Sequence, residues 1–376
     1  MDICEDGMFN FITGLCGESN LPKRNIYIIS DDDEEKRTIS FLERAMPRLI
    51  ENIQTSSPRS VANFNGKKDA LDELYELSNI KSNRVPMICT TKWELIPALA
   101  NCITHLDSYK YQADGGSRRI ACQTLNNLSI PFENQNMMIH GPHSSLLLEK
   151  LTHVIQSRLP ESYLCCLCLM NLSSFPDAPE IILTFTPMSE KERNRTHQRR
   201  KNNSIDAREW DDFANLNRTS IRNPTPPRQM RSDLDVTWNS NFLLKCVENL
   251  MKEHRSFLLS RLLSVEGEAI RWSIGLLRNL SKTRRHCTIL SKTEIPSLIV
   301  SFIEKSPHQP IGWNKDSLEE MCFTVLLNLS QFQESRQVLI ELQTYQVLEN
   351  LVQGVNGQLP LGLNDNLHEI LSLLKQ

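Results

Sequence analysis

The stretch Trp272-Ser-Ile-Gly-Leu-Leu-Arg-Asn-Leu-Ser281 decides the fold, because its ending, Leu-x-Asn-Leu-Ser, recurs along the chain. The recurrence points to repeated structural units rather than to two or three unrelated domains. Three further stretches end in the same way: Ala121-Cys-Gln-Thr-Leu-Asn-Asn-Leu-Ser129, Leu164-Cys-Cys-Leu-Cys-Leu-Met-Asn-Leu-Ser173 and Phe323-Thr-Val-Leu-Leu-Asn-Leu-Ser330. A weaker copy, Leu71-Asp-Glu-Leu-Tyr-Glu-Leu-Ser-Asn-Ile80, has Leu-Ser-Asn-Ile instead.

The spacing of the recurring asparagines gives the length of the unit. Asparagines 79, 127, 171, 279 and 328 are separated by 48, 44, 108 and 49 residues. Helical repeats of the HEAT or armadillo kind run to about 40–47 residues, so the 108-residue gap holds one repeat plus an insertion of about 60 residues. Leu373 falls 45 residues after Asn328 and stands where the asparagine is lost. A terminal, capping repeat is typically irregular in this way.

A second element precedes each ending and has apolar residues every three or four positions, which predicts a helix. Its copies begin at Met46, Leu95, Ser145, Phe242, Ile295 and Tyr345. Proline opens three of them, at 47, 97 and 296, as suits a first helical turn. Shorter stretches, such as Asn134–Ile139 and Arg284–Ile289, predict a third, shorter helix.

This order, a short helix, a Pro-x-x-Leu helix and a helix ending in Leu-x-Asn-Leu, resembles the armadillo repeat family. The resemblance covers about residues 38–376 and is strongest at 266–332. It implies an all-α, right-handed solenoid of about six repeats. A HEAT array is the nearest alternative, but the Asn-Leu-Ser ending favours armadillo.

Composition excludes several classes of protein. Hydrophobic residues make up 40% of the chain, which excludes wholesale disorder, and the net charge of −3 indicates no strong attraction to nucleic acid or anionic membranes. The eleven cysteines form no paired framework. No basic leader opens the chain, and no apolar run reaches the ~18 residues of a membrane helix. We therefore expect a monomer in a reducing compartment, the cytoplasm or nucleus, without membrane insertion.

Two segments do not fit the repeat. Residues 1–37, with the acidic run 31–35, are expected to be a largely disordered tail, in which Ser30 is a possible phosphorylation site before five acids. Residues 188–238 are mixed in charge and lack helical periodicity, so we expect a disordered insertion within the fourth repeat. That insertion is either neutral or carries an import signal near residues 199–201, a phosphorylation site at Thr225 or a partner motif.

Motifs of catalysis and cofactor binding are missing from the sequence. It has no Gly-rich phosphate loop, no Gly-x-Ser-x-Gly elbow and no His-Glu-x-x-His helix. Cys165, Cys166 and Cys168, with His153 upstream, are the best metal candidates, but they lie on one helix and are expected to be core residues. We expect no enzyme activity, no metal, no cofactor and no small-molecule substrate.

The armadillo resemblance implies instead a partner-binding groove lined by the third helices. Their asparagines would pair with the main chain of an extended peptide; otherwise, each only caps a helix or an adjacent loop. Nuclear-import receptors of this family carry Trp four residues before the asparagine, where this chain has Tyr75, Gln123, Leu167, Gly275 and Thr324. A lysine-rich import signal is therefore not the expected ligand, and a partly apolar peptide or helix fits better. The candidate groove residues are Asn79, Asn127, Asn171, Asn279, Asn328, Gln123, Leu167, Trp272 and Thr324.

The predicted function is a non-catalytic scaffold or adaptor for other proteins. One alternative is a regulator, such as an exchange factor for a chaperone or small GTPase. Another is nucleic-acid binding through the arginine-rich 188–238 segment, although that segment lacks the interleaved aromatic residues typical of such binding.

Overall fold

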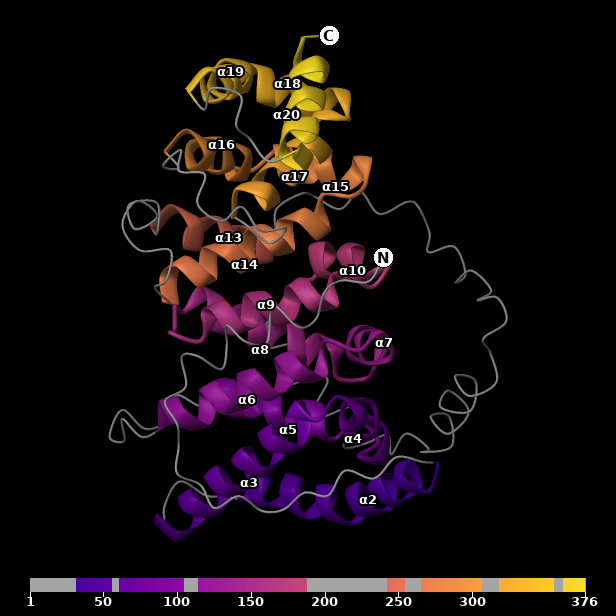
Figure 1. The fold of residues 1–376 in the computed structure, drawn as a ribbon. Coiled ribbons are helices and arrows are strands. Elements are labelled where there is room, and N and C mark those ends of the chain that lie inside the picture. The colour runs from indigo at the N-terminus through magenta and orange to yellow at the C-terminus, as the bar shows by residue number, and fades with distance from the viewer. Residues whose placement is uncertain are drawn as a thin grey trace. The chain divides into compact units, whose positions relative to one another are not determined.

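The computed structural model describes residues 32–55, 61–104, 114–187, 242–253, 265–305, 318–354 and 361–375. Within these ranges the secondary structure is helical throughout, and no strand is present. Contacts divide the chain into two units, Met1–Phe41 and Leu42–Gln376. The second unit contains almost all of the described helices (Figure 1).

The helices follow a recurring order of one short helix and two others, here called the first, second and third helices. The first helices are α4 (Arg84–Thr90), α7 (Phe132–His140), α10 (Ala178–Thr184), α15 (Arg284–Ser291) and α18 (Gln333–Glu341). The second helices are α5 (Leu95–Thr104), α8 (Ser144–Gln156), α13 (Phe242–Glu253), α16 (Ile295–Lys305) and α19 (Thr344–Gly354). The third helices are α3 (Val61–Asn79), α6 (Asp114–Leu128), α9 (Ser162–Leu172), α14 (Val265–Leu280), α17 (Leu318–Ser330) and α20 (Leu361–Leu374). Helix α2 (Asp32–Thr55) precedes them, and a 3-10 turn, η1 (Lys81–Asn83), leads into α4.

Helices of the same kind pack against one another in succession. The third helices contact in the order α3, α6, α9, α14, α17 and α20, and the second helices in the order α5, α8, α13, α16 and α19. Helix α14 lies directly against α9, although the undescribed residues 188–241 separate them in sequence (Figure 1). The insertion therefore interrupts the chain without interrupting the packing. Its own conformation, predicted as disordered, lies outside the described residues.

Ion pairs join the first helices across the same interruption. Glu180 of α10 accepts from Arg285 Nη1 at 2.8 Å and lies 3.0 Å from His286 Nε2, both on α15. Arg284 of α15 pairs in turn with Glu334 of α18. Exposed pairs of this kind contribute little to stability, but they show that α10 and α15 are neighbours.

The leucines of the repeated ending form the interior. In the four Asn-Leu-Ser copies, the leucines one and four residues before the serine are all buried. They are Leu125, Leu128, Leu169, Leu172, Leu277, Leu280, Leu326 and Leu329. Complete burial of one leucine side chain contributes about 1.5–3 kcal/mol. The repetition of Leu-x-Asn-Leu-Ser is thus a repetition of core positions.

Helix α2 begins inside the segment that was predicted to be a tail. Residues 1–37 were expected to be largely disordered, and α2 starts at Asp32; residues 1–31 lie outside the described residues. The early start also places Pro47 inside α2 rather than at a helix opening. Pro97 and Pro296 do lie in first turns, of α5 and α16. Ser30 lies outside the described residues.

Among the helices that the structure describes, none has both the length and the apolar composition needed to cross a membrane.

Candidate functional site

The asparagines of the repeated ending join consecutive third helices. Each donates a hydrogen bond from its side-chain Nδ2 to the Oγ of a serine on the preceding third helix. The four bonds are Asn127 to Ser78 at 3.0 Å, Asn171 to Ser129 at 3.0 Å, Asn279 to Ser173 at 3.1 Å and Asn328 to Ser281 at 2.9 Å. We call these eight residues the asparagine–serine ladder. It runs through α3, α6, α9, α14 and α17, and therefore also across the insertion.

The serines fix the orientation of the amides. Each serine hydroxyl donates to the carbonyl oxygen three residues earlier, at 2.7 Å for Ser78, Ser129 and Ser173 and at 3.1 Å for Ser281. Its single proton is therefore used, and the oxygen can only accept from the next helix. The amide must turn its NH₂ group toward the serine, so its carbonyl oxygen points away from that bond.

The second proton of the NH₂ group is also used in three of the four amides. Asn127 donates to Asn79 Oδ1 at 2.9 Å, Asn171 to Asn126 Oδ1 at 3.1 Å and Asn279 to Met170 O at 3.0 Å. In the described part of the chain, the Oδ1 atoms of the four ladder asparagines accept no hydrogen bond, and none is sealed from solvent. The ladder therefore offers a row of hydrogen-bond acceptors and few donors.

The first copy has a different register from the one expected. The sequence places Asn79 with the other asparagines, but the residue equivalent to Ser129 is Ser78, because both donate to the carbonyl three residues before them. Asn79 instead accepts from Asn127. Counting back two residues from Ser78 puts Glu76 in the asparagine position. Asn79 thus accepts a second hydrogen bond from Asn127, but it does not occupy the asparagine position of the repeat.

The remaining groove candidates are mostly buried. Gln123 is 8% exposed, Leu167 2% and Trp272 7%. Thr324 is half-buried, and its Oγ1 donates to Glu320 O at 2.8 Å. Of the predicted set, Asn79, Asn171, Asn328 and Thr324 keep substantial exposure. The third helices thus expose fewer of the predicted groove residues than the sequence suggests.

Trp272 is buried beside two half-buried charged residues, Glu268 and Arg271, at the start of α14. The Arg271 guanidinium sits 4.9 Å above the Trp272 ring, and Arg271 Nη1 lies 3.7 Å from Glu268 Oε1. Burial raises the pKa of Glu268 above its usual value, although Arg271 and a hydrogen bond from Trp272 act in the opposite direction. Trp272 is therefore a packing and hydrogen-bonding residue in this structure.

Gly275 explains why α9 and α14 approach so closely. A side-chain carbon added there would lie 2.6 Å from Met170 Sδ and 3.2 Å from Met321 Sδ. The side chains of the flanking third helices therefore fill the place where the import receptors of the armadillo family have tryptophan. No tryptophan-like pocket can form at this point of the row.

We expect Gly275→Leu to lower the free energy of unfolding by about 1–3 kcal/mol, because extra atoms in a packed interface force neighbouring side chains to move. Chemical denaturation followed by circular dichroism measures the change. Gly116→Leu is the matched control, since no atom lies within 4 Å of an added carbon there. Equal effects at the two glycines would contradict the close-packing account.

The cysteines proposed as core residues do not converge. Cys165 Sγ lies 3.9 Å from Cys122 Sγ, Cys166 Sγ lies 3.3 Å from Ser273 Oγ, and Cys168 Sγ lies 3.8 Å from Leu125 O. Burial raises the pKa of Cys166 and of Cys168 to about 12, so these thiols stay protonated and unreactive at neutral pH. The described residues contain no group of three or more His, Cys, Asp or Glu side chains able to hold a metal ion.

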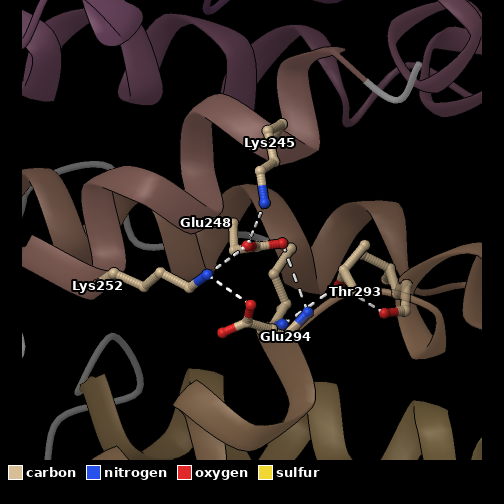
Figure 2. A network of polar contacts seen from close by, with 7 residues as sticks. Lys245, Glu248, Lys252, Thr293 and Glu294 are labelled. Atoms are coloured by element: carbon tan, nitrogen blue, oxygen red, sulfur yellow. Dashed lines mark hydrogen bonds and ion pairs between the residues drawn. The ribbon is translucent and has the colours of Figure 1, made fainter. Parts of the chain in front are cut away.

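A buried carboxylate ties α13 to the beginning of α16. Glu248 is 3% exposed, and its Oε1 accepts from Lys245 Nζ and Lys252 Nζ, each at 2.8 Å. Figure 2 shows the two lysines reaching Glu248 from different directions. Its Oε2 accepts from the Glu294 N–H at 3.4 Å, and Lys252 also lies 2.7 Å from Glu294 Oε1. The undescribed segments 188–241 and 254–264 flank α13. This network is therefore one of the described contacts that hold α13 against the neighbouring helices.

We expect the contribution of Glu248 to stability to depend on pH. Burial alone would raise the pKa of Glu248, but the hydrogen bonds from the two lysines and the Glu294 N–H together lower it below the usual 4.5. A carboxyl whose pKa is lowered by folding stabilises the protein fully above its unfolded pKa, and the contribution disappears as pH falls through the folded pKa. Glu248→Gln should cost about 1–3 kcal/mol near neutral pH, as for hydrogen bonds to charged groups.

The corresponding measurement is denaturant unfolding of wild type and Glu248→Gln between pH 7 and pH 3. The difference in the free energy of unfolding should be constant at the higher pH values and shrink below about pH 4.5, as Glu248 becomes protonated and resembles glutamine. Glu43→Gln, at an exposed carboxylate, is the control and should show almost no difference. A difference that grew on acidification would contradict the network.

Positive charge gathers beside Asn279. Arg278 precedes it, and Lys282 follows Ser281 at the end of α14. Burial lowers the pKa of Lys282, and the nearby Arg278 charge lowers it further. Two neighbouring cations favour an approaching anion. The part of the acceptor row beside Asn279 is therefore suited to an acidic group.

Comparisons with known proteins address the fold alone. No protein-family model matches the chain, and no curated protein matches it in sequence. A solved structure concerning a phosphorylation switch that controls the interaction between cadherin and β-catenin is similar, with a TM-score of 0.55 and 10% sequence identity. The match covers 93% of this chain and spans 59% of the other. The chain therefore has an all-helical fold that matches an armadillo-type structure.

The ladder serines are inter-helix contact positions that the sequence analysis did not single out. Ser129, Ser173 and Ser281 stand two residues after Asn127, Asn171 and Asn279, inside the ending that defined the repeat. Their constant offset was the available signal, since a hydroxyl repeated at one position beside an amide suggests a shared bond. Thr225, the other predicted phosphorylation site, lies outside the described residues.

Proposed function

We propose that residues 38–376 form an armadillo-type solenoid of about six repeats that acts as a non-catalytic scaffold, binding a segment of a partner protein along the third helices. The observation that carries the proposal is the row of Oδ1 acceptors left open by the asparagine–serine ladder. Regularly spaced acceptors of one kind suit a regularly spaced set of donors, and the main chain of an extended peptide supplies such a set. The likeness to a solved structure that concerns the interaction between cadherin and β-catenin supports a protein-binding role.

The number of NH₂ protons already used by the ladder asparagines limits which hydrogen bonds a ligand can form with them. Both NH₂ protons of Asn171 and one of Asn328 are used within the fold, so a bound main chain would mainly donate its N–H groups to Asn171 and Asn328 Oδ1. Arg278 and Lys282 add a preference for an acidic side chain near Asn279. The proposed ligand is therefore an extended, acidic segment with free N–H groups.

The test compares two double variants by pull-down and mass spectrometry. Asn171→Ala/Asn328→Ala removes the two more exposed acceptors together with their ladder bonds. Ser129→Ala/Ser281→Ala removes the same two inter-helix bonds but keeps both Oδ1 atoms, and is the matched control. We expect specific partners to disappear only with the asparagine variant, with both variants folded by circular dichroism.

The other outcomes are also informative. Equal loss with the serine variant would mean that helix spacing, and not the acceptor row, governs binding. Partners retained by both variants would place the binding site elsewhere and reject the proposal.

A further inference from the structure

A cluster of aromatic rings lies on the surface beside the ladder. Phe132 opens α7, and Phe175 lies in the turn between α9 and α10. Their ring centroids are 4.9 Å apart, and the His140 ring meets Phe175 edge-on at 5.6 Å. The rings hold one another in place, so the cluster is ordered before any partner arrives. We call Phe132, His140, Phe175 and Asp177 the aromatic corner.

The apolar surface of the aromatic corner is open. Phe132 is 58% exposed and is one of three large hydrophobic side chains exposed among the described residues. An exposed phenylalanine face costs about 25 cal/mol for each Å² of apolar area left in water. Covering that face would therefore stabilise a complex, and the neighbouring rings present a surface that needs little rearrangement.

The charge of the aromatic corner is negative. Asp177 has a side chain 54% exposed, and its Oδ1 lies 3.1 Å from His140 Nε2. Within the described ranges this is its one side-chain partner, so the Oδ2 atom accepts no hydrogen bond there. Glu133, next to Phe132, is exposed and forms no ion pair with the described residues. A π-face bordered by carboxylates attracts a cation.

We propose that the aromatic corner is a second docking surface, separate from the ladder, that receives an arginine side chain of a partner protein. The guanidinium pairs with the free oxygen of Asp177, and the arginine side chain lies across the rings of the aromatic corner toward Phe132. Arginine fits better than lysine because its planar group can stack on a ring and present N–H donors to a carboxylate at the same time. The proposal does not depend on the ligand of the third helices.

The test uses two peptides that differ only in charge. One is acetyl-Gly-Gly-Arg-Gly-Gly-amide, and the other has citrulline, a neutral side chain of the same shape, in place of arginine. Dissociation constants come from NMR titration of each peptide with the full chain. The wild type should bind the arginine peptide about threefold to tenfold more tightly, the range expected for a cation on an aromatic face beside a carboxylate.

The variants locate the preference. Phe132→Ser and Asp177→Asn should each reduce it to about one, whereas Glu43→Gln and Ile340→Ser, at an exposed acid and an exposed apolar residue elsewhere, should leave it unchanged. Both tested side chains are exposed, so the variants should fold, as circular dichroism would show. Equal binding of the two peptides by the wild type, a preference that survives Phe132→Ser, or one that Glu43→Gln also removes would overturn the proposal. The Asn171→Ala/Asn328→Ala variant should keep the preference, which separates this test from that of the ladder.

Discussion

Replacing Trp272 with alanine is expected to lower the free energy of unfolding by about 3–5 kcal/mol, the usual cost of removing a buried tryptophan. The side chain is 7% exposed, supports the Arg271 guanidinium and donates a hydrogen bond to Glu268. Its loss would open a cavity and leave a buried carboxyl with one partner fewer. Denaturant unfolding with a fixed slope measures the change.

Trp272→Phe is the matched control for that prediction. It keeps most of the buried ring and should recover most of the lost stability, although not the hydrogen bond to Glu268. Measuring partner binding by the same variants also tests whether Trp272 contributes to a binding groove. A Trp272→Ala protein of unchanged stability that lost its partners would show that the ring belongs to a binding surface, contrary to its position in the structure.

Asn279→Ala is expected to cost more stability than Asn328→Ala. Asn279 is buried and donates to both Ser173 Oγ and Met170 O, whereas Asn328 is half-buried and donates to Ser281 Oγ. Ser173 Oγ and Met170 O still bond to each other without the amide, so the cost is that of the hydrogen bonds lost, about 0.5–1.5 kcal/mol each. We therefore expect a loss of about 1–3 kcal/mol for Asn279→Ala and of about 1 kcal/mol for Asn328→Ala.

A double-mutant cycle identifies the bond responsible. If Asn279 and Ser173 share a hydrogen bond, the double variant Asn279→Ala/Ser173→Ala should cost less than the two single variants together, by about 1 kcal/mol. Asn279→Ala with Ser129→Ala is the control pair, because these residues share no bond in the structure. Strict additivity for Asn279 and Ser173 would contradict the ladder.

The sequence predicts the helices well because their signals are local. The apolar period places the helices beginning near residues 145, 242 and 295 within a residue of α8, α13 and α16. The Leu-x-Asn-Leu ending places the last turns of α6, α9, α14 and α17. Each prediction depends on side chains a few residues apart on one helix, and no knowledge of the neighbouring helices is needed.

The groove is predicted less well because it depends on how helices meet. Leu167 and Trp272 share the spacing of surface positions, yet they are buried, since α14 lies close against α9 where Gly275 has no side chain. The first copy fails for a similar reason. Leu-Ser-Asn-Ile can be aligned by its asparagine or by its serine, and only the bond from Asn127 to Ser78 shows that the serine is the equivalent residue.

The asparagine–serine ladder has a polarity. Each amide gives protons to the helix before it, so the row has a closed beginning at Ser78 and an open end at Ser330, whose hydroxyl already donates to Leu327 O. Leu373 occupies the next asparagine position and has no proton to give. The four bonds therefore all run in one direction, from each third helix to the one before it. A Leu373→Asn change would place an amide at the next position of the ladder, where Ser330 Oγ could accept its proton.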